Sequence, residues 1–428
     1  MNSPVTFSNQ SRQTLTDWLA YIEQTHPIDH IELGLQRVLT VAERGDLQQL
    51  PGIKILIGGT NGKGSSARCL EQMLLQQGLS VGVYTSPHLL RFNERLRINQ
   101  QDVSDSEWIA GLQLVDTLRA DVALTYFEFT TLAAFAILKQ RQVDVCLIEV
   151  GLGGRLDATN IITPDASILT TIDLDHQDWL GDDRATIGRE KAGIFRQDAV
   201  TIVGDFDPPE TVLAIAKQLN GQLWLQQQDF HFQLSNKDHT WQWTCGELVL
   251  SDLPIPQLPL QNISTCLACL RALDKLPSPD VIRAVLTSLT LPGRMQWLQR
   301  APAVVVDVAH NPQSAAYLAE QLQRLQGQYR KVHAIVGMLK DKDQRQSLAS
   351  LAQYIAQWHC VSLPGPRGAV ASHLAAQLPL TASVHCYDNV VEAWQSLKLG
   401  LQSDELVIVF GSFVTVSQFL NMWQQENV

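Results

Sequence analysis

The sequence lacks both a long hydrophobic run and an excess of positive charge. Its longest apolar stretch, residues 132–138, is far shorter than the roughly 20 residues that a membrane-spanning helix needs. Lys and Arg total 32 against 43 Asp and Glu, which gives a formal net charge of −11. A nucleic-acid-binding surface needs clustered basic residues, so this balance argues against one. The sequence therefore predicts neither a membrane protein nor a nucleic-acid-binding protein.

Cysteine is also sparse, with seven residues in 428. Their odd number and scattered positions indicate reduced thiols and a cytoplasmic location. Cys266 and Cys269 form a C-x-x-C pair, but the pair lies in a helical pattern with no partner pair at zinc-binding spacing. Both are therefore expected to be core residues. The polar N-terminal residues contain no apolar signal core, so no secretion signal is expected.

The hydrophobic pattern predicts an α/β protein. A hydrophobic content of 45% excludes a mostly disordered chain, and 428 residues suffice for two or three domains. Two amphipathic helices are predicted within residues 12–50. Strands at 53–57, 81–84, 144–150 and 166–171 then alternate with helices, which is typical of a parallel sheet covered on both faces. Residues 222–253 alternate with period two, which predicts antiparallel strands.

A domain boundary is predicted at the linker Leu291-Pro292-Gly293. After it, strands at 304–307, 332–336, 360–363, 384–387 and 406–410 alternate with helices, as in a Rossmann-like domain. We therefore expect an N-terminal domain over residues 1–292, of the phosphate-loop ATPase type, with a parallel sheet and a small antiparallel sheet. Residues 293–428 are expected to form a C-terminal Rossmann-like α/β domain.

A glycine-rich loop, GGTNGKGS at residues 58–65, lies between a predicted buried strand and a predicted helix. Successive glycines let backbone N–H groups turn toward an anion, the helix N-terminus adds positive potential, and Lys63 adds a point charge. The loop departs from the strict phosphate-loop pattern, whose first glycine would fall at Ile57. An ordinary turn is the alternative, but the strand–loop–helix context favours phosphate binding.

Three candidate metal ligands, Ser86, Glu149 and His176, lie at or just past the ends of predicted strands. A Mg²⁺ ion that bridges nucleotide phosphates takes one or two carboxylates, a hydroxyl and water. Taken singly, Ser86 fits a turn residue and His176 a helix cap. Glu149 is less expected, because a carboxylate that ends an apolar strand must find a partner. Together they predict a nucleotide–metal site.

Two further segments carry polar groups in glycine-rich surroundings. Asp157, in the loop at residues 151–160, could accept hydrogen bonds from a heterocyclic amine, with Thr125 and Phe127 near the pocket wall. A structural crossover loop and core aromatics are the alternatives. Lys191 lies in GREKAGI at residues 188–194, where a solvated helix end with weak ion pairs is the alternative to a functional lysine.

In the second domain, polar groups again follow strands. Asp307 could bind a ribose, His310 a carboxylate substrate, and Ser412 ends the last strand in the same way. Arg294, at the predicted hinge, could reach phosphates when the domains close. Each of them, taken alone, also fits an ordinary turn position.

In this order the motifs GTNGKGS, TSPHL, TYFE, EVGLGGRLDATN, LDH, GREKAGI, LPGR and DVAHNP resemble the folylpolyglutamate synthase/dihydrofolate synthase family of the Mur ligase superfamily. They cover most of the chain, and the density of matches over residues 125–193 is similar to that of the bifunctional bacterial enzymes. The resemblance implies an N-terminal ATPase domain and a C-terminal Rossmann-like domain with ATP between them. Residues 31–39 resemble a family loop over the pterin site.

The resemblance also implies roles for individual residues. ATP would contact Thr60, Asn61, Gly62, Lys63, Asn262, Arg294 and Asp307. Mg²⁺ would be held by Ser86, Glu149 and His176, and a carbamylated Lys191 would help to hold a second ion. Lys63, Lys191 and His176 would act in catalysis. The pterin would contact Thr125, Phe127, Asp157 and Ala158, and the incoming glutamate would lie near His310 and Ser412.

The implied activity is an ATP-dependent ligase that adds L-glutamate to dihydropteroate and to reduced folates through an acyl phosphate. A monomer is expected. Two alternatives stay open: another ligase of the superfamily, such as a UDP-muramyl peptide ligase, and a nucleotide-dependent switch that hydrolyses ATP without ligation. A measurement of pterin binding would distinguish the implied activity from the first alternative. A test of whether ATP turnover depends on glutamate would distinguish it from the second.

Overall fold

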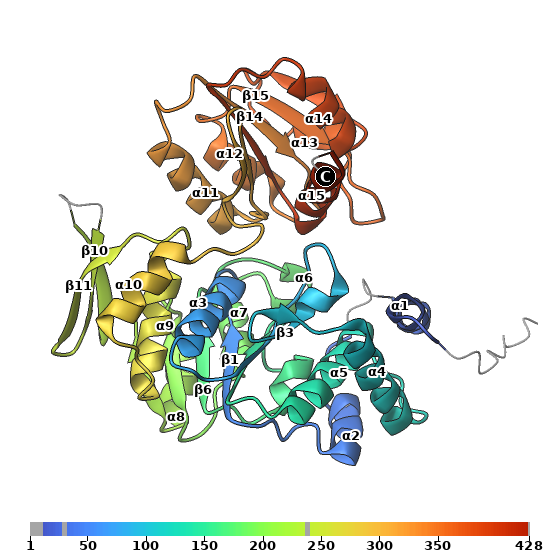
Figure 1. Ribbon diagram of the computed structural model, residues 1–428, viewed down its shortest axis with the longest axis vertical. Helices are drawn as coiled ribbons and strands as arrows, with labels where there is room; N and C mark the ends of the chain where they lie inside the picture. The colour runs from blue at the N-terminus through green and yellow to red at the C-terminus, as the bar shows by residue number, and fades with distance from the viewer. Residues whose placement is uncertain (1–11, 28–31, 236–239, 427–428) are drawn as a thin grey trace, which may run out of the picture.

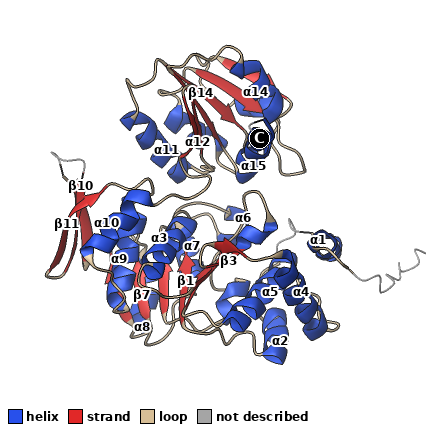
Figure 2. Ribbon diagram, in the orientation of Figure 1, coloured by secondary structure: helices blue, strands red, loops and turns tan. Residues whose placement is uncertain are grey.

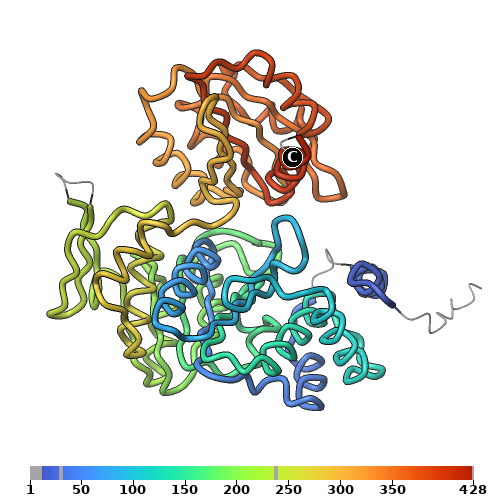
Figure 3. The backbone as a smooth tube through the Cα atoms, in the orientation of Figure 1, coloured from blue at the N-terminus to red at the C-terminus, as the bar shows by residue number. Residues whose placement is uncertain are grey.

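A computed structural model describes residues 12–27, 32–235 and 240–426 of the chain. They form two lobes, and the backbone passes from the lower to the upper lobe through the segment that follows α10 (Pro279–Ser288) (Figures 1 and 3). Most of the polar N-terminal segment, and Ile31 of the predicted loop at 31–39, lie outside the described residues. No helix within the described ranges is both long enough and apolar enough to cross a bilayer.

The lower lobe is built on an eight-stranded sheet with the order β4-β3-β2-β5-β1-β6-β7-β8. Neighbouring strands from β2 to β8 pair in parallel, whereas β3 and β4 are antiparallel additions. The parallel strands end at one edge, which is where α/β sheets place ligands. The bounds are β1 (Ile53–Gly58), β2 (Val81–Tyr84), β3 (Leu96–Ile98), β4 (Gln101–Asp102), β5 (Val145–Glu149), β6 (Ala166–Leu169), β7 (Val200–Val203) and β8 (Gln222–Leu225).

Helices cover both faces of this sheet (Figure 2). Alternate residues of β1 show the two faces: Leu56 packs into one core, and Ile55 and Ile57 pack into the other. The first core includes α1 (Leu15–Thr25), α2 (Gln36–Gly45), α4 (Asp105–Arg119), α5 (Tyr126–Arg141), α7 (Arg184–Ala192) and α8 (Glu210–Gln218). The second includes α3 (Lys63–Leu75), α9 (Leu260–Ala272) and α10. Short helices η1 (Phe92–Arg95), η2 (Ala158–Ile161) and α6 (Gln177–Leu180) complete the lobe.

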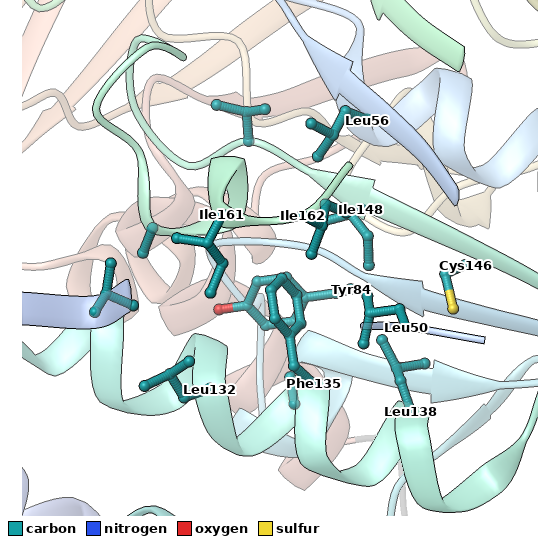
Figure 4. Close-up of a cluster of buried hydrophobic side chains, with 14 of the residues drawn as sticks. Leu50, Leu56, Tyr84, Leu132, Phe135, Leu138, Cys146, Ile148, Ile161 and Ile162 are labelled. Atoms are coloured by element: carbon teal, nitrogen blue, oxygen red, sulfur yellow. The ribbon is translucent and has the colours of Figure 1, made fainter. Parts of the chain in front are cut away.

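Tyr84, at the end of β2, lies in the first core close to the edge that carries the ligand-facing loops. Figure 4 shows its ring beside Phe135 of α5, and their centroids lie 6.3 Å apart. The Tyr84 hydroxyl lies 2.9 Å from the hydroxyl of Thr131. This packing holds the end of β2 rigidly against α5, so the loops on either side of it have fixed starting points.

The small antiparallel sheet contains β9 (Phe230–Leu234), β10 (Thr240–Cys245) and β11 (Leu248–Pro254). The prediction of antiparallel strands over 222–253 is therefore correct for these three but wrong for β8, which pairs in parallel with β7. The reason is the crossover through α8, which brings the chain back alongside β7 in the same direction. Within α9, Cys266 and Cys269 are fully buried, as expected of core cysteines.

The upper lobe has a six-stranded sheet with the order β12-β13-β17-β14-β15-β16. Its five predicted strands pair in parallel, and the unpredicted strand β12 adds an antiparallel edge. The strands are β12 (Gln296–Arg300), β13 (Ala303–Val306), β14 (Lys331–Val336), β15 (Gln357–Val361), β16 (Val384–Tyr387) and β17 (Glu405–Phe410). The helices are α11 (Pro312–Arg324), α12 (Gln344–Leu351), α13 (Ala371–Ala375), α14 (Val390–Lys398) and α15 (Phe413–Glu426). The predicted fold class is confirmed.

Candidate functional site

A cavity of about 790 Å³ lies between the lobes, at the carboxyl ends of both parallel sheets. Loops that follow β1, β2, β5 and β6 of the lower lobe meet loops that follow β13, β14 and β17 of the upper lobe. Every site residue predicted from the sequence lines this cavity: Thr60, Asn61, Gly62, Lys63, Ser86, Thr125, Phe127, Glu149, Asp157, Ala158, His176, Lys191, Asn262, Arg294, Asp307, His310 and Ser412. Residues that are far apart in the sequence therefore line the same cleft.

The glycine-rich loop leads from β1 into α3, whose N-cap is Gly62. Gly62 has a φ of 93°, and a Cβ atom there would collide with the side chain of Asn262, so only glycine fits. Lys63 folds its ammonium group over the loop and donates to the carbonyl oxygens of Gly59 (3.0 Å) and Thr60 (3.2 Å). The first N–H groups of α3 have no partner within the helix, and residues 62–65 line the cavity, so this loop could hold an anion.

Glu149 is the strongest sign of a cation in this cleft. Its side chain is buried at the end of β5, and burial raises its pKa, while the nearby charges of Lys63 and Arg294 act in the opposite direction. Among the described residues no arginine or lysine forms an ion pair with it. Ser86 lines the same cavity. A divalent cation would compensate the buried charge, so the residues present fit one.

His176 completes the lower-lobe donor set as the N-cap position of α6. Burial, together with Lys342, lowers the pKa of its imidazole to about 4, so the ring is neutral and has a nitrogen lone pair for a metal. In the described part of the chain, no three His, Cys, Asp or Glu side chains cluster closely enough to hold a metal ion alone. Phosphate oxygens and water would therefore have to supply the remaining ligands.

In the motif at residues 188–194, one charged side chain fits a solvated helix end and another fits a functional lysine. Glu190 forms an ion pair with Arg155 at 3.0 Å on the half-exposed side of α7, as a solvated helix end would. Lys191 instead turns inward and is only 4% exposed. Burial and the nearby ammonium group of Lys63 lower the pKa of Lys191 to about 7. A large fraction of this amine is therefore uncharged at neutral pH.

The aromatic end of the cleft is formed by α5 and the loop before η2. Thr125 caps α5 and accepts a hydrogen bond from the N–H of Glu128 (3.1 Å), and the ring of Phe127 lies 6.4 Å from that of Tyr84. Asp157 caps η2 by accepting from the N–H of Thr159 (3.0 Å), and burial raises its pKa. The carboxylate of Asp157 thus has a structural role and still faces the cavity with unused acceptor capacity.

The upper-lobe residues are held by backbone hydrogen bonds. The Asp307 carboxylate accepts from the N–H groups of Met295 and Ala309, both at 2.8 Å. Arg294 lies half-buried near it, with its guanidinium 5.4 Å from the ring centre of Phe413. These contacts fix a carboxylate and a guanidinium at the mouth of the upper lobe.

His310 and Ser412 lie near the start of α11 and α15. The Nδ1 atom of His310 donates to the carbonyl of Val308 (2.8 Å), and burial together with Lys342 lowers the pKa of the ring to about 4. The Ser412 hydroxyl accepts from the N–H of Thr415 at 3.0 Å. His310 is therefore a neutral side chain whose Nε2 lies 4.0 Å from the carboxylate of Asp175, and Ser412 is a helix cap.

Sequence reasoning missed the network that joins the lobes. Lys342, in the loop after β14, forms a buried ion pair with Asp175 at 2.6 Å. Asn311, the N-cap of α11, exchanges side-chain hydrogen bonds with Asn61 of the glycine-rich loop, at 3.0 and 3.1 Å. Burial alone would raise the pKa of Asp175, but the charge of Lys342 holds this pKa well below its usual range. No local signal in the sequence marks Lys342, because it lies in a charged loop well past the end of β14 and its partner belongs to the other lobe.

We expect Lys342→Ala to destabilise the protein by about 3 kcal/mol, because it leaves the Asp175 carboxylate buried without its partner. The lowered pKa of Asp175 means that this stabilisation is present above its usual pKa of 3.8 and is lost as the pH falls further. Urea unfolding midpoints of wild type and variant should therefore differ clearly at pH 7 and converge in acid. Lys340→Ala, in the same loop with an exposed side chain, is the matched control. A variant with a wild-type midpoint at pH 7 would contradict the role of the ion pair.

Comparison with known proteins gives consistent matches. A family model described as Mur ligase, glutamate ligase domain, matches residues 293–413. The dihydrofolate synthase/folylpolyglutamate synthase of Escherichia coli (strain K12) is 43% identical over 414 residues, which cover 96% of each chain. The protein of the same name from Haemophilus influenzae is 41% identical over 429 residues, covering 95% of this chain and 96% of the relative.

Solved structures give the same result. The structure described as E. coli FolC in complex with DHPP and ADP superposes with a TM-score of 0.93 at 40% identity, covering 98% of this chain and 100% of that one. A bifunctional folylpolyglutamate synthase/dihydrofolate synthase with Mn, AMPPNP and L-glutamate bound superposes with a TM-score of 0.89 at 43% identity. That match covers 96% of this chain and 98% of the other.

Proposed function

Because this chain belongs to the dihydrofolate synthase/folylpolyglutamate synthase family, we propose that it is an ATP-dependent ligase that adds L-glutamate to dihydropteroate and to reduced folates. The observation that carries this proposal is the single cleft in which a phosphate-binding loop, an aromatic pocket and the upper-lobe polar groups meet. A ligase needs a nucleotide, an acceptor acid and an amine in one place. An ATPase switch needs only the first of these.

In the proposed reaction, an acceptor carboxylate oxygen attacks the γ-phosphorus of ATP, which gives an acyl phosphate and ADP. The α-amine of glutamate then attacks the acyl carbon, and phosphate and a proton leave as the amide forms. Lys63, at the start of α3, offsets charge on the transferring phosphoryl group. The position of the cleft between two lobes supports this scheme, because closure of the lobes would keep water from the acyl phosphate.

The nucleotide would lie on Thr60, Asn61 and Gly62 and extend toward the upper lobe. Asp307 would bind its ribose, Arg294 would reach its phosphates as the lobes close, and Asn262 would complete the nucleotide site. Ser86, Glu149 and His176 would hold one Mg²⁺, and Lys191 as a carbamate would help to hold a second. Bound Mg²⁺ supplies positive charge that neutralises the phosphate oxygens. The buried Glu149 carboxylate and the neutral His176 ring support these assignments.

The acceptor would bind with its pterin against Thr125, Phe127, Asp157 and Ala158. Asp157 retains acceptor capacity for a ring amine, and Phe127 offers an aromatic face to the heterocycle. Glutamate would enter beside His310 and Ser412. We further propose domains over residues 1–292 and 293–428, a monomer, and a cytoplasmic location, which the free cysteines support.

The test is MgATP turnover with L-glutamate and either dihydropteroate or a reduced folate, monitored by phosphate release and by product mass. We expect glutamate-dependent turnover and one added glutamate with both acceptors. Glutamylation of only one acceptor would contradict the bifunctional assignment. Hydrolysis that does not depend on glutamate would favour a switch, and ligation of UDP-muramyl substrates in place of pterins would favour another ligase of the superfamily.

A further inference from the structure

Arg95 is a buried cation without an acidic partner. It ends η1, is only 4% exposed, and lines the cleft. Within the described residues no carboxylate forms an ion pair with its guanidinium. Arg97, two residues further on, is paired with Glu71 at 3.2 Å, and Arg37 is paired with Glu128 at 2.7 Å. A buried charge without a counter-ion is costly, so the cleft carries an unused positive site.

The side chain of Arg95 is fixed by neutral groups. Its Nε donates to Nδ1 of His88 at 3.0 Å. An arginine nitrogen can only donate, so Nδ1 of His88 must be the unprotonated acceptor and the imidazole is neutral. The rings of Phe92 and Tyr126 lie 5.5 and 5.9 Å from the guanidinium carbon. These contacts orient the guanidinium and leave its charge uncompensated.

The neighbouring acid is not available to Arg95. Glu94 directs its carboxylate to the backbone N–H groups of Leu89, Leu90 and Arg91, at 2.7–2.9 Å. The guanidinium is therefore free to bind an anion that enters the cleft.

Arg95 lies between the two ends of the acceptor site. Its backbone carbonyl accepts from the N–H of Thr85 at 2.9 Å, which places the backbone of Arg95 next to the segment that carries Ser86. On its other side it faces Tyr126, next to the aromatic pocket. An anion bound here would belong to the middle or the tail of the acceptor.

On the basis of the proposed function, we propose that Arg95, oriented by His88, binds the α-carboxylate of the terminal glutamyl group of folate acceptors. This carboxylate stays negative throughout the reaction, whereas the reacting carboxylate gives up its charge to the acyl phosphate. A guanidinium paired with the reacting group would stabilise the substrate more than the transition state. Dihydropteroate has a single carboxylate, which reacts, so Arg95 is a specificity residue for folates over dihydropteroate.

The test compares Arg95→Gln, Arg95→Lys and wild type with both acceptors. We expect Arg95→Gln to raise KM for a monoglutamyl reduced folate by about 10- to 100-fold, the range for a lost charge-assisted hydrogen bond. The KM for dihydropteroate and both kcat values should change less than about threefold, and Arg95→Lys should recover part of the loss. Arg91→Gln is the matched control, because Arg91 is exposed and pairs with Asp102 outside the cleft.

A second measurement has one arm that uses wild type alone, so that arm does not depend on a variant that might misfold. Wild type should bind a reduced folate more tightly than the same folate with its α-carboxylate converted to a neutral amide, and Arg95→Gln should bind both equally. The proposal is overturned if wild type does not discriminate acid from amide, if the variant keeps that discrimination, or if KM rises equally for both acceptors. Glutamylation of dihydropteroate by wild type tests the ligase assignment separately.

Discussion

Lys63→Ala is expected to lower glutamate-dependent ATP turnover by about a thousandfold, which is the upper range for loss of one preorganised charge-stabilising donor. In the structure the Lys63 ammonium group lies over the glycine-rich loop, where it donates to two loop carbonyls. It is therefore poised beside the anion site before any phosphate arrives. Its removal takes away a cation that would offset the developing charge on the transferring phosphoryl group. Turnover is measured as glutamate-dependent release of phosphate.

Lys54→Ala is the matched control for this experiment. Lys54 lies on the same strand that leads into the loop, but its ammonium group pairs with Asp165 at 2.8 Å, away from the cleft. We expect normal turnover in this variant. Both proteins should show wild-type circular dichroism and thermal unfolding, because the two loop hydrogen bonds of Lys63 contribute little to the fold. Normal activity in Lys63→Ala would contradict the phosphate-loop assignment.

Lys191→Ala is expected to lose activity by about a hundredfold or more, with partial recovery when a small carboxylate such as formate or acetate is added. The lysine is buried, has no ion pair among the described residues, and has a pKa lowered to about 7, so its free amine can react with carbon dioxide. The carbamate carries a negative charge where an ammonium ion would repel a metal. A free carboxylate in the space left by the alanine would restore that charge.

The direct measurement is ¹³C NMR of wild type equilibrated with labelled bicarbonate, which should show a carbamate signal that is absent from Lys191→Ala. Lys217→Ala, on the exposed surface of α8, should retain both the signal and the activity. Full activity in Lys191→Ala would show that the lysine is structural. Loss of activity without rescue and without a carbamate signal in wild type would contradict the modification.

The sequence predicted which residues line the cleft better than it predicted the edges of the sheets. Glycine-rich loops and polar residues at strand ends are local signals, so residues such as Lys63, Glu149 and Asp307 could be identified before their partners were known. Strand β8 could not be assigned to its sheet, because the alternation in Gln222–Leu225 is the same for a parallel and an antiparallel neighbour. Strand β12 was missed because its residues are half-buried and carry little periodic signal.

The contacts between the lobes had no local signal. Lys342 belongs to a charged loop that looks like ordinary solvent-exposed sequence, and its partner Asp175 lies in the other lobe. Arg95 could not be identified from the sequence either, because its lack of an acidic partner can be seen only in the folded structure. A pairing between residues far apart in sequence, or the lack of one, is a property of tertiary structure.

The hydrogen bonds between Asn61 and Asn311 have a consequence for thermodynamic linkage. Asn61 belongs to the loop that is expected to cradle phosphate, and Asn311 begins the first helix of the other lobe. A nucleotide that displaces either amide changes the free-energy difference between lobe spacings, and reciprocity then requires each spacing to have its own nucleotide affinity. Consider a molecule that binds only to the upper lobe and shifts this equilibrium. It would change the dissociation constant for ATP by a certain factor, and ATP would change the dissociation constant for that molecule by the same factor.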